Sequence, residues 1–549
     1  MEVVIFFERF PHLHELIFSE LDDESLVTCK EVDKTWNKFI DGQKLPWIRM
    51  IEKQIGRLEH YPETWKKVTS KTQVKNVKEL ALTVDQFYNF YNLDGNGEDW
   101  SSRNISTDVS WTPIHIAASW GRLDLCQFIF EKVIEKNPPC SYDGRTPLHM
   151  AAANGHLDVY KLLMDCGNDK NPIDNEGETP FHIAAEEGHM EICKLIMTYV
   201  SDKNPSRYDD FTPLHCAARE GNLEVCKLFF ENLTNKNPAD NEGATPLHYA
   251  AQAGHWNICK LIIDLLDDKN PSDNMGRTPL YFAAKAGNFE FCKLIIDLLD
   301  DKVNEKNPSR NDGVTPLHIA AREGHLDICE LIFDCLEDKN PSDNYGGAPF
   351  HIAADSGHFE ICKIIMTYVN DKNPACDVGI TPLHLAAQEG HLNVCKLIID
   401  CLDDKNPSGV DGFTPLHNAA FRGHLEVCKF FLENVSNKNP ANNQGFTPLH
   451  IAAREGNLEV CKLFFQNVRN KNPADNVGDT PLHYAAKQGH FDVCKQIIED
   501  VADKNPSNDR GETPISFATQ YGHKEICKLF KKRRKLGPNT IQKSKAAKK

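Results

Sequence analysis

Histidine and cysteine, the two side chains that most often bind zinc, recur at fixed positions along this 549-residue chain. There are 23 histidines and 19 cysteines. One histidine follows Thr-Pro-Leu, a second follows a glycine, and twelve of the cysteines share a single repeated position. A zinc site gathers its ligands around one ion. No C-x-x-C or H-x-x-x-H pair supplies two adjacent ligands within a repeat, so we expect no metal and no cofactor.

The same regularity argues against a nucleophile built from cysteine and histidine. Catalysis needs one constellation in a perturbed environment, whereas these residues occur in equivalent copies along the chain. We therefore predict that the chain is not an enzyme. The cysteine is interpreted as a small buried hydrophobic residue, and the histidine as a hydrogen-bonding link between threonine and neighbouring backbone.

The elements that carry these residues repeat at a nearly constant length. Thr-Pro and its equivalents begin at positions 112, 146, 179, 212, 245, 278, 315, 348, 381, 414, 447, 480 and 513. Eleven of the twelve steps are 33 or 34 residues. The step from Thr278 to Thr315 is 37, because KVNE is added around Lys302 to Glu305. This internal repeat predicts an array that grows in one dimension, not a set of globular domains.

Each unit follows the pattern GxTPLHxAAxxGHLEVCKLIxxxxxDKNPxD, which predicts a helix, a turn, a second helix and an extended hairpin. Threonine is a helix N-cap, and proline suits the first helical position. The alanine pair gives a small apolar face for close approach of neighbouring repeats, and glycine ends the helix. The second helix is predicted to be longer and more hydrophobic, and KNP stops it. The DxxG that follows is a turn signal.

The TPLH and AAxxGH motifs at this period resemble the ankyrin repeat family from Trp111 to Phe530, about three quarters of the chain. The resemblance implies an all-α fold, an ankyrin-repeat solenoid of about thirteen helix-turn-helix repeats with β-hairpin fingers. It also implies binding of protein partners along the fingers and the concave first helices, and no catalysis. KNP departs from the glycine-alanine-aspartate turn of many members, and single units depart at Tyr160, Ala348 and Ser516.

Residues 8–52 form a candidate domain before the array. Their apolar residues fall at helical spacing and predict three short helices with these faces: Leu13, Leu16, Ile17 and Leu21; Leu26, Cys29 and Val32; Trp36, Phe39 and Ile40. Fewer than about 50 residues bury little surface, so such a piece gains stability from a partner or from the adjacent array. Residues 53–110 are predicted to be a partly helical connecting segment.

This small domain resembles the F-box, which binds a Skp1-type adaptor of cullin ubiquitin ligases. The resemblance begins at Phe10 and Pro11 and includes Glu-Leu-Ile at 15–17 and a later Trp47, although the helix after Pro11 is one residue shorter than in many members. It implies adaptor contacts by Pro11, Leu13, Leu16, Ile17, Leu21, Leu26, Val32 and Trp36. The implied function is substrate recognition for an SCF-type (Skp1–cullin–F-box) ubiquitin ligase, with the repeats capturing the target. The alternative is a plain scaffold or retention protein whose N-terminus only caps the array or binds something else.

Charge is unevenly distributed along the chain. The net charge is −17, and residues 528–549 carry ten Lys or Arg and no acid, so residues 1–527 sum to −17 − 10 = −27. The acidic body should repel nucleic acid, and only the tail could attract it or an anionic membrane. KKRRK at 531–535 fits either a nuclear import signal or a solvated basic helix end. The tail at 531–549 is predicted to be disordered.

The location is predicted from the missing export signals. MEVVIFFERF has no basic region before its short apolar run, and no later segment holds about 18 uninterrupted apolar residues. The 19 cysteines are an odd number, and twelve of them share one repeated position, which argues against a disulfide framework. We expect a protein that is neither secreted nor membrane-spanning, in the cytoplasm and/or nucleus. DGNGED at 94–99 is interpreted as a loop, because Asp99 and Ile105 stand where a calcium loop needs Gly and Glu.

Apolar side chains also occur where the repeat should face water. They are candidates for binding the target: Trp120, Tyr208, Phe211, Tyr345, Ile380, Phe413, Phe421 and Phe446. Exposed aromatic clusters often mark partner surfaces. The alternative is that each of these side chains folds over its neighbouring hairpin as local packing.

Overall fold

The computed structural model describes residues 111–130, 134–167, 169–299 and 306–534. The predicted domain at 8–52, the connecting segment at 53–110 and residues 535–549 of the basic tail lie outside these ranges. The chain divides into two compact units, Met1–Ser201 and Asp202–Lys549. Wherever the chain is described, both units are built from paired helices.

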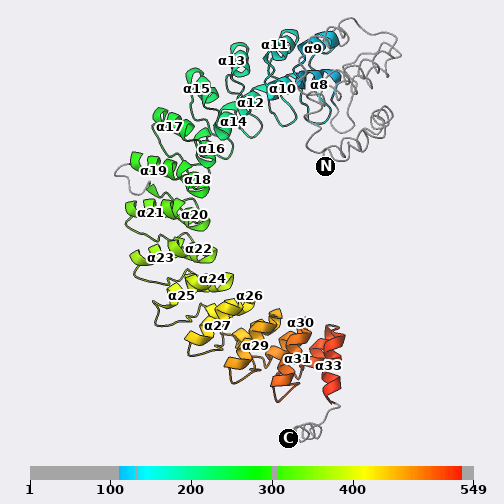
Figure 1. Ribbon diagram of the computed structural model, residues 1–549, viewed down its shortest axis with the longest axis vertical. Helices are drawn as coiled ribbons and strands as arrows, with labels where there is room; N and C mark the ends of the chain where they lie inside the picture. Colours follow the sequence, from blue (N-terminus) through cyan, green and yellow to red (C-terminus); the bar gives the residue numbers. More distant parts are fainter. Residues whose placement is uncertain (1–110, 131–133, 168, 300–305, 535–549) are drawn as a thin grey trace, which may run out of the picture. The chain divides into compact units, whose positions relative to one another are not determined.

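The first unit contributes three described pairs of helices, in each of which a first helix is followed by a second (Figure 1). The pairs are α8 (Pro113–Ser119) with α9 (Leu123–Phe130), α10 (Pro147–Ala153) with α11 (Leu157–Cys166), and α12 (Pro180–Glu186) with α13 (Met190–Tyr199). The first helices pack on one another in chain order, α8 on α10 and α10 on α12.

The second unit contributes ten pairs. Its first helices are α14 (Pro213–Glu220), α16 (Pro246–Ala253), α18 (Pro279–Ala286), α20 (Pro316–Glu323), α22 (Pro349–Ser356), α24 (Pro382–Glu389), α26 (Pro415–Arg422), α28 (Pro448–Glu455), α30 (Pro481–Gln488) and α32 (Pro514–Gln520). Its second helices are α15 (Leu223–Asn232), α17 (Trp256–Leu265), α19 (Phe289–Leu298), α21 (Leu326–Cys335), α23 (Phe359–Tyr368), α25 (Leu392–Ile399), α27 (Leu425–Asn434), α29 (Leu458–Asn467), α31 (Phe491–Asp500) and α33 (Lys524–Arg534). Consecutive first helices are neighbours, and the second helices form a parallel row beside them (Figure 1). For the described residues, the predicted all-α repeat stack is confirmed.

The first helices begin and end as the residue types predict. In α20, Thr315 is the N-cap with extended backbone at φ −112° and ψ 168°, and Pro316 takes the first helical position. Gly324 ends the helix in the left-handed conformation with φ 85°. Proline lacks the N–H that would have no partner there, and glycine carries no Cβ to resist a positive φ. The predicted start and stop signals are therefore confirmed.

The core lies between the row of first helices and the row of second helices. In the repeat of α20 and α21, the side chains of Ala320, Ala321, Cys329 and Ile332 are completely buried. Alanine lets adjacent first helices approach closely, and cysteine fills a small space under the second helix. One repeat covers only part of this apolar surface, and its neighbours cover the rest. Burial therefore holds the array together repeat by repeat.

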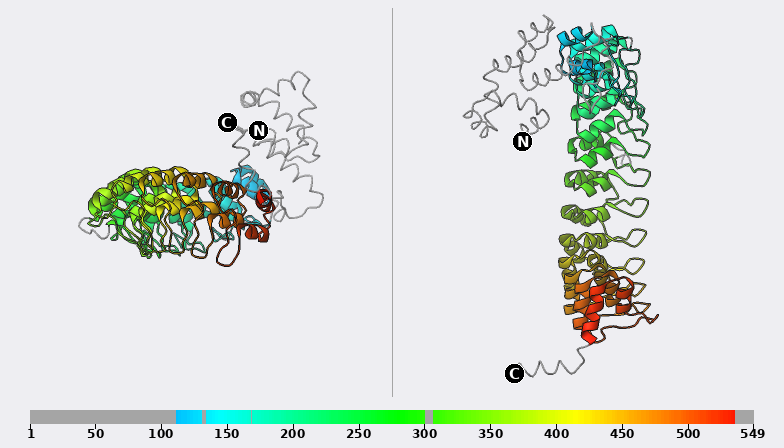
Figure 2. Two further views of the ribbon diagram at one scale, coloured as in Figure 1. Left: turned by 90° about the horizontal axis from the view of Figure 1, so that it is seen from below. Right: turned by 90° about the vertical axis from the view of Figure 1, so that its right-hand side faces the viewer.

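The fingers between repeats are tight turns. No β-strand is assigned among the described residues, so the prediction of β-hairpin fingers is wrong in this respect. In the finger before α24, the Cys376 N–H donates to the Ile380 carbonyl at 2.9 Å, and the Gly379 N–H donates to the Cys376 carbonyl at 2.8 Å. Two such bonds close a turn but are too few for a ladder between two strands. In the second unit, the fingers project on the same side of the helices (Figure 2).

The Asp-Lys-Asn-Pro motif joins the second helix of one repeat to the first helix of the next. Between α21 and α22, the Lys339 ammonium donates to the Phe333 carbonyl near the end of α21. The Asn340 side-chain oxygen accepts from the Phe350 N–H at 3.0 Å, in the first turn of α22. Asp338 orders the connection by accepting from the Asn340 N–H at 2.9 Å. The lysine thus donates to a carbonyl at the C-terminus of one helix, and the asparagine accepts from an N–H at the N-terminus of the next. This role of the KNP motif was not evident from the sequence alone.

Candidate functional site

The histidines of the Thr-Pro-Leu-His motif link most repeats to the finger that follows them. His318 Nδ1 lies 2.8 Å from Thr315 Oγ1 and accepts from the Thr315 backbone N–H at 3.2 Å. On the far side of the ring, Nε2 lies 3.2 Å from the Gly347 carbonyl oxygen. A carbonyl only accepts, so Nε2 carries the proton. The contact between Nε2 and a carbonyl recurs at His115, His149, His215, His248, His351, His384, His417, His450 and His483.

Burial holds these imidazoles in the neutral form. Desolvation lowers the pKa of His417 to about 4. Protonation would place a hydrogen on Nδ1, against the backbone N–H that already donates there. A ring fixed in this state offers no nitrogen for a metal or for general base catalysis. The interpretation of this histidine as a hydrogen-bonding link is confirmed.

The second set of histidines, after the glycine, links each repeat to the one before it. His358, at the start of α23, donates from Nε2 to the Arg322 carbonyl at 2.9 Å. Where asparagine takes this position, its amide replaces the ring, as Asn457 Nδ2 donates to the Ala420 carbonyl at 2.9 Å. The two sets of side chains therefore tie a repeat to both of its neighbours.

The repeated cysteines are buried thiols. Burial raises the pKa of Cys395 to about 12, and the same cause acts on Cys193, Cys226, Cys292, Cys362, Cys428 and Cys461. The thiolate is the nucleophile, so these groups are unreactive near neutral pH. The cysteines of the described ranges form no disulfide. The interpretation of the repeated cysteine as a small buried hydrophobic residue is confirmed.

One repeat lacks its threonine and allows a test of the histidine link. At the N-cap of α22, Ala348 offers its backbone N–H to His351 Nδ1 at 3.2 Å but has no hydroxyl. We expect Ala348→Thr to raise the free energy of unfolding by about 1 kcal/mol, because it restores the N-cap oxygen. Urea unfolding of the full chain measures the change. Thr381→Ala in the next repeat is the matched control and should lower stability by a similar amount. A variant with Ala348→Thr that is no more stable would contradict this role of threonine.

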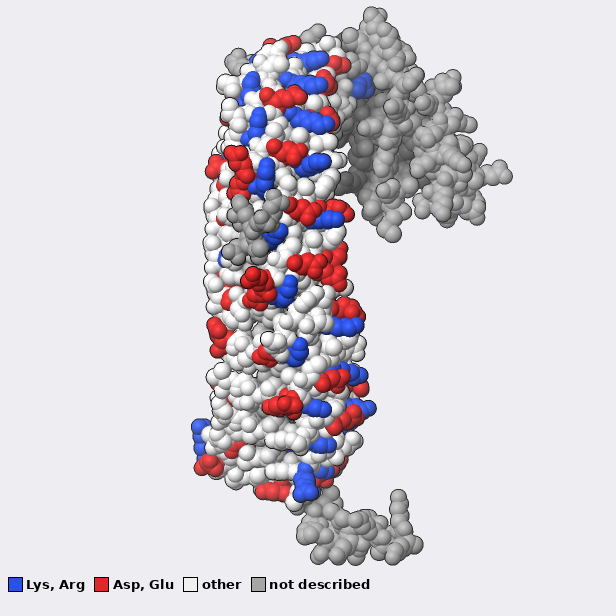
Figure 3. All heavy atoms as spheres, turned by 90° about the vertical axis from the view of Figure 1, so that its left-hand side faces the viewer, with Lys and Arg blue, Asp and Glu red and all other residues white. Residues whose placement is uncertain are grey.

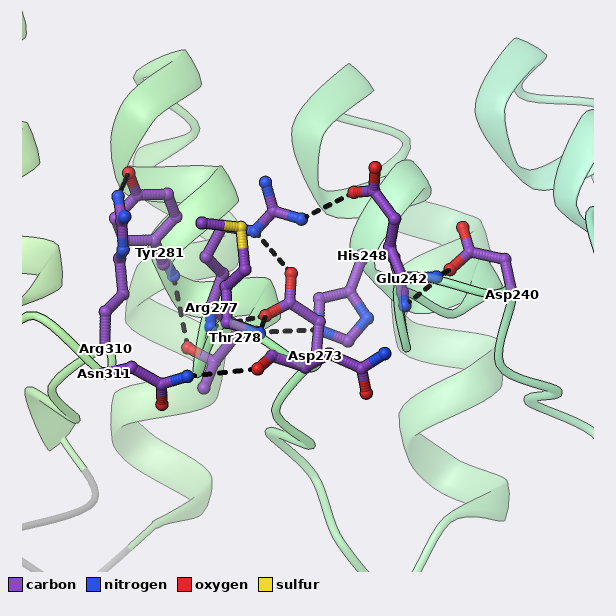
Figure 4. Close-up of polar contacts among 12 residues, drawn as sticks. Asp240, Glu242, His248, Asp273, Arg277, Thr278, Tyr281, Arg310 and Asn311 are labelled. Carbon is purple, nitrogen blue, oxygen red and sulfur yellow. Dashed lines mark hydrogen bonds and ion pairs between the residues drawn. The ribbon is translucent and has the colours of Figure 1, made fainter. Parts of the chain in front are cut away.

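Charged side chains on three successive fingers connect neighbouring repeats (Figure 4). Arg277 pairs with Asp273 of its own finger and with Glu242 of the preceding finger, the latter at 3.0 Å. Arg310 donates to the Tyr281 hydroxyl at 2.9 Å, and Tyr281 stands where most repeats have the linking histidine. The charges of these fingers therefore act between repeats, as the histidines do elsewhere.

The predicted target-binding side chains differ in their exposure. Phe211 is buried, stacks on His215 with 4.8 Å between ring centroids, and lies close to Arg207 and Arg219. These contacts agree with the alternative of local packing. Trp120, Ile380, Phe413 and Phe446 are half-buried, whereas Tyr208, Tyr345 and Phe421 are exposed. Their role in binding a target stays a prediction.

Sequence reasoning missed several exposed apolar residues at fingertips, among them Met275, Val477 and two residues on adjacent fingers. Val378 is 65% exposed and Val410 is 68% exposed, on the two fingers that follow the finger of Tyr345, which is 74% exposed. These residues could have been found by aligning the sequences of the fingers on their glycines. Tyr345 and Val378 both come one residue before the glycine, and Val410 comes two residues before it. Three successive fingers thus present an apolar residue at the tip.

Stacked helix pairs that are linked through hydrogen bonds of threonine and histidine are typical of a helical repeat protein. The family model described as ankyrin repeats (3 copies) matches residues 89–174, 159–240, 181–273, 228–307, 264–343, 296–377, 335–408, 383–475 and 461–540. The chain belongs to the ankyrin repeat family. No model of the F-box matches residues 8–52. A comparison with curated proteins found no match.

Membership of this family implies protein partners and is typical of adaptors without catalytic activity. Within the described ranges, no group of three or more His, Cys, Asp or Glu side chains is placed to hold a metal ion. No helix of those ranges is long and apolar enough to cross a membrane.

Proposed function

We propose that this ankyrin repeat protein is a protein-binding adaptor that presents captured proteins to an SCF-type ubiquitin ligase. The capture function is supported by one observation above all. The repeated histidines and cysteines are occupied in joining the repeats, while the fingertips stay exposed and differ from repeat to repeat. A constant interior with a variable rim is typical of a repeat protein that binds other proteins.

The ligase function is supported by the F-box resemblance of residues 8–52 alone. In this proposal, the Skp1-type adaptor contacts Pro11, Leu13, Leu16, Ile17, Leu21, Leu26, Val32 and Trp36. Other subunits transfer ubiquitin, so this chain needs no cofactor. Such a protein acts in the cytoplasm and/or nucleus, and the basic run at 531–535 offers a nuclear import signal.

Replacing Leu16, Ile17 and Leu21 together by aspartate should abolish co-purification of a Skp1-type adaptor with the full chain. These residues share one face of the first predicted helix, and charges on that face would prevent an apolar contact. The helical circular dichroism of the array should not change. Replacing Tyr345, Val378 and Val410 by lysine is the control, which should leave adaptor binding intact.

A second candidate function is a scaffold or retention protein that has no link to a ligase. It is favoured by the lack of a match between residues 8–52 and any F-box model. If the unchanged chain captures no Skp1-type adaptor, or if the triple variant captures it equally well, this second function replaces the ligase role.

A further inference from the structure

Four successive fingers of the second unit carry what we name the apolar strip: Tyr345, Val378, Ile380, Val410, Phe413 and Phe446. Three of these side chains lie at fingertips. Ile380, Phe413 and Phe446 are half-buried at the finger bases, directly before the N-cap threonines. An apolar row on the side where fingers project into water is typical of a partner surface.

The rings of the apolar strip lack the arginine cover seen earlier in the unit. Phe211 holds the position that Phe413 and Phe446 take in their own repeats. The guanidinium carbons of Arg207 and Arg219 lie 4.8 and 5.3 Å from the centre of its ring. Within the described ranges, no cation–π contact involves Phe413 or Phe446. Phe446 packs instead against Tyr484 and His450, with 4.9 and 5.6 Å between ring centroids, and Phe413 packs against His417 at 5.4 Å. Both phenylalanines are only half-buried, so part of each ring is accessible to another molecule.

The surroundings of the apolar strip are acidic. The fingers at 341–348, 374–381 and 407–414, with α22, α24 and α26, carry Asp343, Asp355, Asp377, Glu389, Asp411 and Arg422. The net charge of these six side chains is −5 + 1 = −4. The second helices differ, because basic and acidic side chains are interspersed on their face (Figure 3). Lys363 pairs there with Glu360 at 3.7 Å. The strip thus complements a cationic partner.

A buried donor without an acceptor lies beside the apolar strip. Asn442 is 6% exposed, and its side-chain oxygen accepts from the Gln444 and Phe446 N–H groups at 3.0 and 2.9 Å. These two bonds fix the orientation of the amide. Nδ2 then points away from them, is buried and has no partner.

The equivalent asparagine two repeats later has its acceptors. Asn508 Nδ2 donates to Asp479 Oδ1 at 2.8 Å and to Glu512 Oε2 at 3.1 Å. The corresponding positions around Asn442 are Phe413 and Phe446, 29 residues before and 4 residues after. Both acceptors are thus replaced by rings of the strip. A partner that brings an oxygen, after a neighbouring side chain turns aside, would complete the hydrogen bond.

The spacing of the repeats selects the conformation of the partner. Packed helices typically lie about 8–10 Å apart, so the strip offers one apolar contact per such step. In a polyproline II segment, every third residue faces the same side and advances about 9 Å. Such a segment also leaves its carbonyls unpaired, whereas a helix uses its carbonyls internally. An extended segment therefore fits both the spacing and the donor of Asn442.

We propose that the apolar strip binds an extended segment of a partner protein. The segment has apolar side chains three residues apart, lysine or arginine at its flanks, and a backbone carbonyl that accepts from Asn442. This assignment rests on the proposed protein-binding function and specifies its surface and the chemistry of its partner.

The probe is a fluorescent peptide with leucine at every third position, proline and serine between, and two lysines at each end. Anisotropy titration with the full chain should give saturable binding that weakens as salt is raised. A peptide with glutamates in place of the lysines should bind at least tenfold more weakly. So should a peptide of the same composition with leucines grouped together. Equal binding of all three peptides would overturn the assignment.

Variants locate the peptide on the chain. Tyr345→Lys, Val378→Lys and Val410→Lys together should weaken binding at least tenfold, because they remove apolar contacts and repel the basic flanks. The control replaces the exposed fingertip residues Tyr208, Met275 and Val477 by lysine and should change binding less than twofold. Both variants add the same charge, so only the location differs. Equal loss in the two variants would mean binding by charge alone and would refute the strip.

Asn442→Asp tests the donor. The aspartate keeps the two hydrogen bonds from the finger backbone, as Asp475 does in the next finger at 3.0 and 2.9 Å. It loses the N–H and adds a negative charge, which by itself favours a basic peptide. Binding that weakens several-fold despite this charge supports the carbonyl contact. Unchanged or tighter binding would remove Asn442 from the site.

Failure here can be separated from failure of the proposed function. If the chain captures a target protein equally well with and without the strip substitutions, the proposed adaptor function stands and the apolar strip is not the binding surface. A chain that captures no protein in either form loses both. Preference for a helical peptide with leucines seven residues apart would overturn the extended conformation.

Discussion

The repeat stack is expected to unfold as the pH is lowered from neutral toward 4, well before all carboxylates are protonated. Desolvation lowers the pKa to about 4 at seven of the linking histidines, His115, His149, His215, His248, His384, His417 and His450. It also lowers the pKa of His318, His351 and His483. The unfolded chain binds protons at these residues near pH 6.5, whereas the folded chain does not. Their contribution is therefore complete above pH 6.5 and is lost as the pH falls toward 4.

The expected size of this effect is large because the sites repeat. Each histidine with a folded pKa of about 4 loses on the order of 2 kcal/mol by pH 5. Several such losses approach the total stability of a typical protein, about 5–15 kcal/mol. Urea midpoints at pH 7, 6 and 5 measure the change, and their slope gives the protons taken up on unfolding. Uptake of several protons is expected between pH 6 and 5, and a midpoint that stays constant over this range would refute the buried neutral state.

Replacing Gly324 by alanine is expected to lower the free energy of unfolding by about 3 kcal/mol. Gly324 has φ +85°, and an added Cβ would lie 2.5 Å from Cε1 of His358 in the next repeat. The backbone conformation and the contact both oppose the substitution. Moving the ring would break the bond from His358 Nε2 to the Arg322 carbonyl. Denaturant unfolding measures the loss, and hydrogen exchange should locate it around α20 to α23.

Gly522 provides the matched control for this substitution. It follows α32 with φ +77°, and a Cβ there would meet no atom within 4 Å. Gly522→Ala should therefore cost only the backbone term, about 1 kcal/mol. Equal losses in the two variants would show that the contact between glycine and the next histidine does not contribute.

Much of the fold could be predicted from the sequence, because the same residue types recur at the same positions in successive repeats. Threonine, proline and glycine at the helix ends have local preferences, and the structure bears them out in α20. The roles of the linking histidine and of the cysteine also followed, since neither was placed to form a singular site. The prediction of β-hairpin fingers was wrong, because turn signals in the sequence do not reveal whether the chain on either side of a turn forms strands. The contacts of Lys339 and Asn340 were missed, since they reach residues several positions away in the folded chain.

The candidate binding surface was harder to predict. Phe211 was selected for its type, but its burial against neighbouring side chains depends on packing that composition does not reveal. Val378 and Val410 were overlooked because valine at one fingertip is unremarkable, and only their adjacency to Tyr345 makes them a row. The unpaired Nδ2 donor of Asn442 could not be predicted from the sequence. The position that supplies an acceptor to the equivalent asparagine is held here by Phe413, which lies far from Asn442 along the chain. The predictions for residues 8–52 lie outside the described residues.

The central claim is that, within each unit, most repeats carry one buried histidine that is neutral, is fixed between two backbone segments and links the repeat to the next finger. The most direct test is nitrogen NMR of the full chain labelled at histidine, recorded between pH 7 and 5.5. The account predicts a group of rings that keep the proton on Nε2, do not titrate in this range and exchange slowly with solvent. If every histidine titrates near its ordinary pKa, the claim is wrong.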